Sequence, residues 1–180
     1  WSRAYENRSL TIGYKQTISQ PYIVAKMTEL LVSHTKSRGK VFESILEIGS
    51  GCGYQSAILS FFSEEVHAIE RIKPLVQKSR ENLSNLKINN VLVKHGDGYQ
   101  DWEKEKKYDG IICAAAPREY PNDLISVLNN DAKLVIPVGG ATQKLNMITK
   151  IHQDEIKEEE FDDVSFVPML AGKSEDGNDV

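Results

Sequence analysis

Residues 44–55 read Ser-Ile-Leu-Glu-Ile-Gly-Ser-Gly-Cys-Gly-Tyr-Gln, an apolar run that leads into three glycines at alternate positions. Glycine lacks a Cβ, so it adopts positive φ and lets a ligand approach the main chain. A turn of this kind lies at the carboxyl end of a first parallel strand, where open α/β sheets bind their ligands. The stretch therefore predicts a nucleotide-like ligand bound at the edge of an α/β sheet.

The spacing of the glycines discriminates between cofactors. A dinucleotide fingerprint, G-x-G-x-x-G, requires its third glycine where Tyr54 stands here. Gly49, Gly51 and Gly53 instead form G-x-G-x-G, with Glu47 two residues ahead. This pattern favours a ligand without pyrophosphate, such as S-adenosyl-L-methionine.

A second acid follows at the end of the next apolar run. Glu70 lies 21 residues beyond Gly49, and a carboxylate in this place can accept both hydroxyl groups of a ribose. The glycine turn and this acid together predict a class I methyltransferase. The alternative that the residues leave open is a loop that needs glycine only for turning.

The composition is that of one soluble globular domain of 180 residues, 40% hydrophobic and 27% charged. Cys52 and Cys113 lie in glycine-rich or apolar contexts, so we expect reduced, packed thiols in a cytoplasmic protein. The four histidines lack metal-ligand spacing, and we expect no metal. A net charge of −4 without a basic cluster argues against a nucleic-acid partner. No stretch approaches the roughly 18 apolar residues of a membrane span, so we expect no membrane partner. We also expect the protein to be a monomer.

Strand and helix signals alternate from residue 44 to residue 137, which predicts a doubly wound, mostly parallel Rossmann-like sheet. We expect parallel strands at 44–48, 65–69, 91–95, 108–113 and 133–137, and helices at 21–31, 55–63, 73–86 and 120–128. Residues 145–152 and 163–169 are expected to form an antiparallel C-terminal hairpin around a solvated acidic tip at 153–162. We expect one methyltransferase domain over residues 1–172, and a flexible tail at 173–180.

A block before the first strand is more specific than the glycine turn. It reads Ile-Gly-Tyr-Lys-Gln-Thr-Ile-Ser-Gln-Pro-Tyr-Ile-Val-Ala over residues 12–25. His-Gly-Asp-Gly at 95–98, Leu-Val-Ile-Pro-Val-Gly at 134–139, Gln-Lys-Leu at 143–145 and Phe-Val-Pro at 166–168 follow it. In their order and spacing, from about residue 4 to residue 172, these segments resemble the protein-L-isoaspartate O-methyltransferase family. Lys15 and Cys52 depart from the family pattern, and family members carry a further, largely helical N-terminal extension, which we expect to be missing here.

The resemblance implies transfer of a methyl group from S-adenosyl-L-methionine to the free α-carboxylate of L-isoaspartyl residues in damaged proteins and peptides, which begins their repair. It implies that Ser19 is the catalytic residue that orients this carboxylate. The expected substrate-binding residues are Thr17, Ser19, Pro137, Val138, Gly139 and Gln143. The expected cofactor-binding residues are Thr17, Ile18, Glu47, Gly49, Ser50, Gly51, Gly53, Glu70, Arg71, Asp97, Gly98 and Ala114, with Asp97 accepting the adenine amino group.

The nucleophile decides what the protein must supply. An α-carboxyl group with a pKa of about 3.3–3.7 is already ionised at pH 7. We therefore expect no side chain to act as an obligatory base, and the histidines to be spectators. Two other functions stay open: a class I methyltransferase acting on another small carboxylate or metabolite, and a non-catalytic adenosyl-ligand-binding domain.

Overall fold

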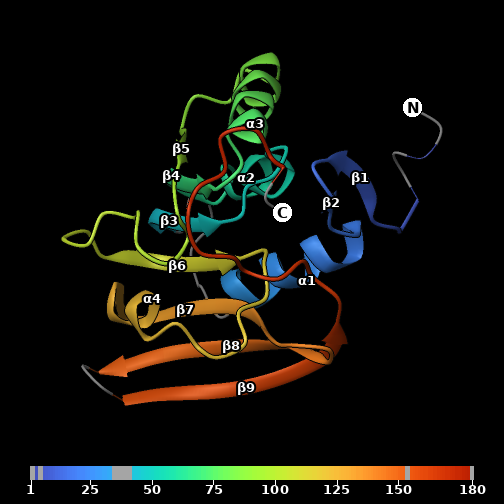
Figure 1. Ribbon diagram of the computed structural model, residues 1–180. Helices are drawn as coiled ribbons and strands as arrows, with labels where there is room; N and C mark the ends of the chain where they lie inside the picture. The colour runs from blue at the N-terminus through green and yellow to red at the C-terminus, as the bar shows by residue number, and fades with distance from the viewer. Residues whose placement is uncertain (1–2, 4–5, 34–41, 153–154, 179–180) are drawn as a thin grey trace.

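The computed structural model describes residues 3, 6–33, 42–152 and 155–178, and it is built around one seven-stranded sheet (Figure 1). The strand order is β5-β4-β3-β6-β7-β8-β9. The first five of these strands are mutually parallel: β3 (Phe42–Ile48), β4 (Ser63–Glu70), β5 (Val91–His95), β6 (Tyr108–Cys113) and β7 (Leu128–Gly139). The antiparallel strands β8 (Gln143–His152) and β9 (Glu155–Val164) complete the sheet. The prediction of a mostly parallel Rossmann-like sheet with an antiparallel C-terminal hairpin is confirmed.

Helices cover both faces of this sheet. One face is covered by α1 (Pro21–Val32), α2 (Tyr54–Leu59) and α3 (Lys73–Asn85), and the other by α4 (Asn122–Ser126). Met27 of α1 and Leu59 of α2 pack with Ile45 of β3 on the first face. Leu124 of α4 packs with Tyr108 of β6 on the second. Burial on both faces explains the continuous apolar runs of the central strands.

A small hairpin precedes the sheet, although the residue pattern does not predict it. It consists of β1 (Leu10–Gly13) and β2 (Gln16–Ile18), joined by Tyr14 and Lys15 at φ of 54° and 51°. Hairpin turns with two left-handed residues favour Asn-Gly, so this turn lacks its usual sequence signal. The Ile12 side chain reaches the glycine turn, where its Cδ1 atom lies 3.1 Å from the position a Cβ would take at Gly51.

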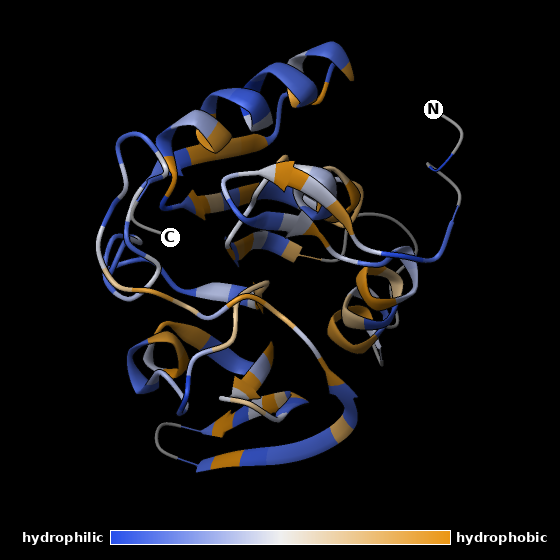
Figure 2. Ribbon diagram, turned by 45° about the vertical axis from the view of Figure 1, so that its right-hand side comes forward, coloured by the Kyte–Doolittle hydropathy of each residue, from blue (hydrophilic) through white to orange (hydrophobic). Residues whose placement is uncertain are grey.

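The acidic run is an edge strand, so its prediction as a hairpin tip is wrong. Residues 155–164 form β9, which pairs along β8, and residues 165–167 are not in a strand. Residues 153–154 lie outside the described residues. Ile156 and Phe161 are half-buried between exposed carboxylates, and β9 is largely hydrophilic (Figure 2). Exposed charges on an edge strand discourage pairing with strands of other molecules. An acidic segment is therefore suited to the edge of the sheet.

Three helix predictions run too long. The helix expected at 55–63 ends at Leu59, because β4 already begins at Ser63, and Phe61 is 72% exposed. The helix expected at 120–128 covers only Asn122–Ser126, since β7 begins at Leu128. The helix expected at 73–86 ends one residue earlier, and Leu86 is exposed.

The described part of the C-terminal tail is packed, in contrast to the expected flexibility. Ser174 is 1% exposed, and its backbone exchanges hydrogen bonds with Arg71 and Lys73 at 2.8 and 3.0 Å. Glu175 forms an ion pair with Lys73 at 2.6 Å. These contacts fix residues 174–175 beside the carboxyl end of β4.

Lys133 of β7 fastens the end of α1 to the sheet. Its ammonium group donates hydrogen bonds to the Leu30 carbonyl, the Ser33 carbonyl and the Ser33 hydroxyl, at 3.2, 2.7 and 2.8 Å. Helix carbonyls in the last turn lack intrahelical donors, and a cation stabilises them. We expect Lys133→Met to lower the free energy of unfolding by about 1–3 kcal/mol, measured by urea denaturation.

The matched control is Lys107→Met, which removes an exposed lysine with one hydrogen bond to the Ser126 carbonyl. This variant should change stability by less than about 0.5 kcal/mol. Equal stabilities of the two variants would contradict the role of Lys133.

Candidate functional site

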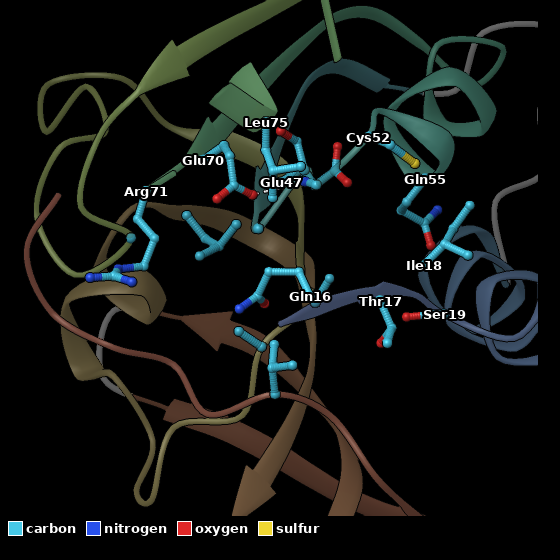
Figure 3. A pocket seen from close by; sticks show the side chains of 18 of the residues that line it. Gln16, Thr17, Ile18, Ser19, Glu47, Cys52, Gln55, Glu70, Arg71 and Leu75 are labelled. Atoms are coloured by element: carbon cyan, nitrogen blue, oxygen red, sulfur yellow. Dashed lines mark hydrogen bonds between the residues drawn. The ribbon is translucent and has the colours of Figure 1, made fainter. Parts of the chain in front are cut away.

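One pocket lies along the carboxyl ends of four parallel strands (Figure 3). Its floor comes from the segments that follow β3, β4, β5 and β6, and β2 and the segment after β9 close it from the sides. The expected site residues that line this pocket are Thr17, Ile18, Ser19, Glu47, Gly49, Ser50, Gly51, Glu70, Arg71, Gly98 and Ala114. Residues far apart in the sequence thus line the same cavity.

The glycine turn has the backbone that its sequence predicts. Gly49, Gly51 and Gly53 have φ of 85°, 54° and 86°, in the left-handed region that favours glycine. The amide of Gly49 donates to the Ile69 carbonyl at 2.8 Å, which ties the turn to β4. Gly49 and Gly51 line the pocket, whereas Gly53 packs beneath it, with Ser79 Oγ 2.7 Å from the position of a Cβ.

Glu70 holds the turn from the end of β4. Its Oε2 accepts a hydrogen bond from the Gly51 amide at 2.8 Å, and its Oε1 accepts one from the Ile72 amide at 2.9 Å. The residue is 5% exposed and lines the pocket. Burial raises the pKa of this carboxyl, and the two amides oppose the shift. Each oxygen keeps a second lone pair, so Glu70 can still accept the hydroxyl groups of a ribose.

Glu47 is the most deeply buried charge-bearing group of the pocket. It is 0% exposed, and its Oε2 accepts a hydrogen bond from the Ser56 hydroxyl. Burial raises its pKa from 4.5 to about 7. The hydrogen bond from Ser56 acts to lower this pKa, and repulsion from Glu70 acts to raise it. Figure 3 shows Glu47 and Glu70 on one side of the cavity, with Thr17 and Ser19 across from them.

Two buried oxygens in this wall lack a hydrogen-bond partner among the described residues: Glu47 Oε1 and the Ser50 hydroxyl. Buried polar atoms normally have hydrogen-bond partners. These two oxygens therefore indicate where a polar ligand can provide the partners. A glycine turn without Cβ atoms, two acids and an apolar lining that includes Ile69 and Leu75 suit an adenosyl ligand with a polar tail. The residues present therefore fit S-adenosyl-L-methionine.

A second pocket adjoins the first. Thr17, Ser19, Ala114 and Val167 line both pockets, so these four residues form the wall between them. Asp163 and Phe166 line only the second pocket, which places the end of β9 beside it. A group held in one cavity can approach a group held in the other only at this shared wall.

The start of α1 lies next to Ser19, but not all of its backbone amides are available to bind a ligand. Pro21 has no N–H, and the Tyr22 amide donates to Asn7 Oδ1 at 3.0 Å. Gln20 occupies the N-cap position, and the helix start has no side-chain capping bond. The Ser19 hydroxyl therefore does not cap the helix.

Asp97 is buried outside the pocket lining. Its Oδ1 accepts from the Tyr99 amide at 2.9 Å, and its Oδ2 accepts from Gln100 Nε2 at 3.1 Å and the Gly172 amide at 2.8 Å. This carboxylate orders the loop after β5 and anchors residue 172. Gly98, its neighbour, is the residue of this pair that lines the cavity.

The expected substrate residues at the end of β7 and the start of β8 line neither pocket. They are Pro137, Val138 and Gly139 of β7 and Gln143 of β8. Gln143 accepts from the Phe166 amide at 2.7 Å and donates to its carbonyl at 3.0 Å, so it positions a residue of the second pocket.

Sequence analysis missed several lining residues. They include Ile12, Gln16, Gln55, Leu75, Val167, Pro168, Met169 and Leu170. One group comes from the hairpin and a second from the irregular segment after β9, and both segments lack a periodic signal. The match at Phe166-Val167-Pro168 was the one available sign for the second group.

The described residues contain no group of three or more His, Cys, Asp or Glu that could hold a metal ion. Within the same residues, no helix is long and apolar enough to cross a membrane.

Comparisons with known proteins agree with this geometry. A model of the protein-L-isoaspartate(D-aspartate) O-methyltransferase family matches residues 1–174. The chain is 44% identical over 170 residues to a protein-L-isoaspartate O-methyltransferase of Hahella chejuensis, covering 94% of this chain and 78% of that protein. It is 46% identical over 171 residues to one of Aliivibrio fischeri, covering 95% and 79%. Among solved structures, it resembles a putative Plasmodium falciparum protein-L-isoaspartate O-methyltransferase in complex with S-adenosyl-L-homocysteine. That match has a TM-score of 0.76 and 30% identity, and it covers 92% of this chain and 81% of the other.

Proposed function

This chain belongs to the protein-L-isoaspartate(D-aspartate) O-methyltransferase family, and on that premise we propose that it methylates the free α-carboxylate of L-isoaspartyl residues in damaged proteins and peptides. The methyl donor is S-adenosyl-L-methionine, and the ester formed begins repair of the damaged residue. The observation that carries this proposal is the wall shared by the two pockets.

The shared wall suits transfer between two bound molecules. The donor occupies the pocket around Glu47, Glu70 and the glycine turn, and the isoaspartyl segment occupies the pocket beside Phe166. When bound, the donor supplies an electrophilic methyl group on a sulfonium. Thr17 and Ser19 are the polar side chains present in both pockets, and they orient the carboxylate by donating hydrogen bonds to its oxygens.

No proton has to move in this reaction. The carboxylate is ionised at neutral pH, and its approach to a cation lowers the charge of both partners. Positioning and exclusion of water therefore provide most of the rate. None of the described histidines lines either pocket, in agreement with their proposed role as spectators.

The partners follow from the same proposal. Isoaspartyl-containing peptides and proteins are the substrates, and the enzyme acts as a cytoplasmic monomer without a nucleic-acid or membrane partner. A net charge of −4 supports the absence of nucleic-acid binding, and two free cysteines support a reducing compartment.

We expect Ser19→Ala to lower the turnover of an isoaspartyl peptide by about tenfold to a hundredfold, because one donor to the carboxylate is lost. The affinity for S-adenosyl-L-methionine should change little. Ser19→Thr keeps the hydroxyl and should recover part of the rate. Turnover is measured with the labelled donor, and affinity by calorimetry.

The matched control is Ser126→Ala, at an exposed hydroxyl of α4 that bonds the Asp123 carbonyl. It should leave both quantities unchanged. Wild-type turnover in Ser19→Ala would remove this residue from the mechanism.

A further inference from the structure

Glu47 is a buried acid that forms no ion pair with the described part of the chain. It lies on the β3 face that α1 and α2 cover, where Ile45 packs and the Ser56 hydroxyl donates a hydrogen bond to its side chain. Its Oε1 has no partner among the described residues, and the residue lines the donor pocket. An unpaired buried carboxylate is costly in its ionised form, so burial favours the protonated acid.

Among the described residues, the charged group that acts on Glu47 is another acid, and Arg71, which lines the same pocket, acts on Glu70. Glu70, at the end of β4, repels Glu47, and the Cys52 thiol of the glycine turn lies within its electrostatic reach. Lys78 of α3 acts on Cys52. The buried polar groups of α1 and α2 include the neutral Thr28 and Gln55, which bond one another at 2.9 Å. A cation that stabilises ionised Glu47 therefore has to arrive with the ligand.

We infer that Glu47 distinguishes the sulfonium of S-adenosyl-L-methionine from the thioether of S-adenosyl-L-homocysteine, by giving up its proton when the sulfonium ligand binds. This inference rests on the proposed function, because the two ligands are its methyl donor and its product. The proton leaves to the buffer, and no covalent bond of the ligand changes.

The sign of the effect follows from charge. Below the pKa of about 7 that burial gives Glu47, the acid is neutral, and the two ligands meet the same wall. Above it, the ionised carboxylate attracts the sulfonium, whereas the thioether is uncharged. The α-ammonium group is present in both ligands and therefore does not distinguish them. The ratio of the dissociation constant for the product over that for the donor therefore rises between pH 5.5 and pH 8. We expect a rise of roughly fivefold to tenfold, the effect of about one pKa unit of coupling.

The experiment is calorimetric titration of the protein with each ligand at pH 5.5, 7 and 8. At pH 7 the titrations are repeated in phosphate and in Tris, whose different ionisation enthalpies count the protons released. We expect the sulfonium ligand to release more protons than the thioether at pH 7, by up to about half a proton. In Glu47→Gln this difference should vanish, and the ratio of dissociation constants should become independent of pH.

Glu65→Gln is the matched control. Glu65 is a carboxylate of β4 whose partners are His67 and Lys106, and it lines neither the donor nor the substrate pocket. This variant should keep the wild-type difference in proton release.

Equal proton release for the two wild-type complexes would overturn the inference, whether or not Glu47→Gln folds. So would a pH-dependent ratio that persists in Glu47→Gln. Absence of binding by both ligands would overturn the proposed function as well, which distinguishes the two failures.

Discussion

Gly51→Val is expected to weaken the binding of S-adenosyl-L-methionine by at least about a hundredfold, a loss of about 2.7 kcal/mol. Gly51 has φ of 54°, which a β-branched residue adopts only with strain of about 1–3 kcal/mol. A Cβ there would lie 3.1 Å from Ile12 Cδ1, so the new side chain also pushes on the hairpin that covers the pocket. Calorimetric titration measures the affinity, and circular dichroism checks that the sheet is retained.

Gly140→Val provides the matched control. Gly140 lies in the turn between β7 and β8, without a left-handed φ, and a Cβ there would have no neighbour within 4 Å. The same substitution at this position should bind the ligand as the wild type does. Tight binding by Gly51→Val would show that the glycine turn does not contact the ligand.

Glu70→Ala should impair both binding and stability. The Gly51 and Ile72 amides each lose a charged acceptor at 2.8–2.9 Å. Hydrogen bonds to charged groups contribute about 1.5–3 kcal/mol each, and the bonds to a ribose are lost as well. We expect binding at least about a hundredfold weaker, with unfolding at about 2–4 kcal/mol lower free energy, measured by calorimetry and urea denaturation.

Glu70→Gln separates the two effects, because it keeps the size of the side chain and one carbonyl acceptor. It should recover part of the stability while remaining weak in ligand binding. A Glu70→Ala protein that binds as tightly as the wild type would exclude Glu70 from the ligand site.

The parallel part of the fold follows from local patterns. β5 and β6 have the bounds that the apolar runs predict, since both lie in a sheet covered by helices. The antiparallel edge was harder to predict. β9 carries carboxylates at most positions, and only its pairing with β8 makes it a strand. The hairpin turn at Tyr14 and Lys15 escaped prediction for a related reason, because contacts hold left-handed residues that do not favour that conformation.

The site was predictable where backbone geometry dictates residue type. Two glycines at positive φ and two acids at strand ends are visible in the sequence, and they line the pocket proposed to bind the donor. Contacts made across long sequence distances were not visible. The sequence does not indicate that the Asp97 carboxylate accepts hydrogen bonds from residues 99, 100 and 172. Nor does it indicate that Gln143 bonds the Phe166 backbone. The buried pairing of Glu47 with Ser56 was likewise hidden, because a serine at the start of a helix usually indicates a cap.

The proposed activity is tested by transfer of labelled methyl groups from S-adenosyl-L-methionine to two synthetic peptides. The peptides share one sequence and differ only in an L-isoaspartyl or a normal aspartyl residue. We expect base-labile label on the isoaspartyl peptide alone, with Ser19→Ala slower under the same conditions. Equal labelling of both peptides, or donor binding without transfer to either, would contradict the proposed activity.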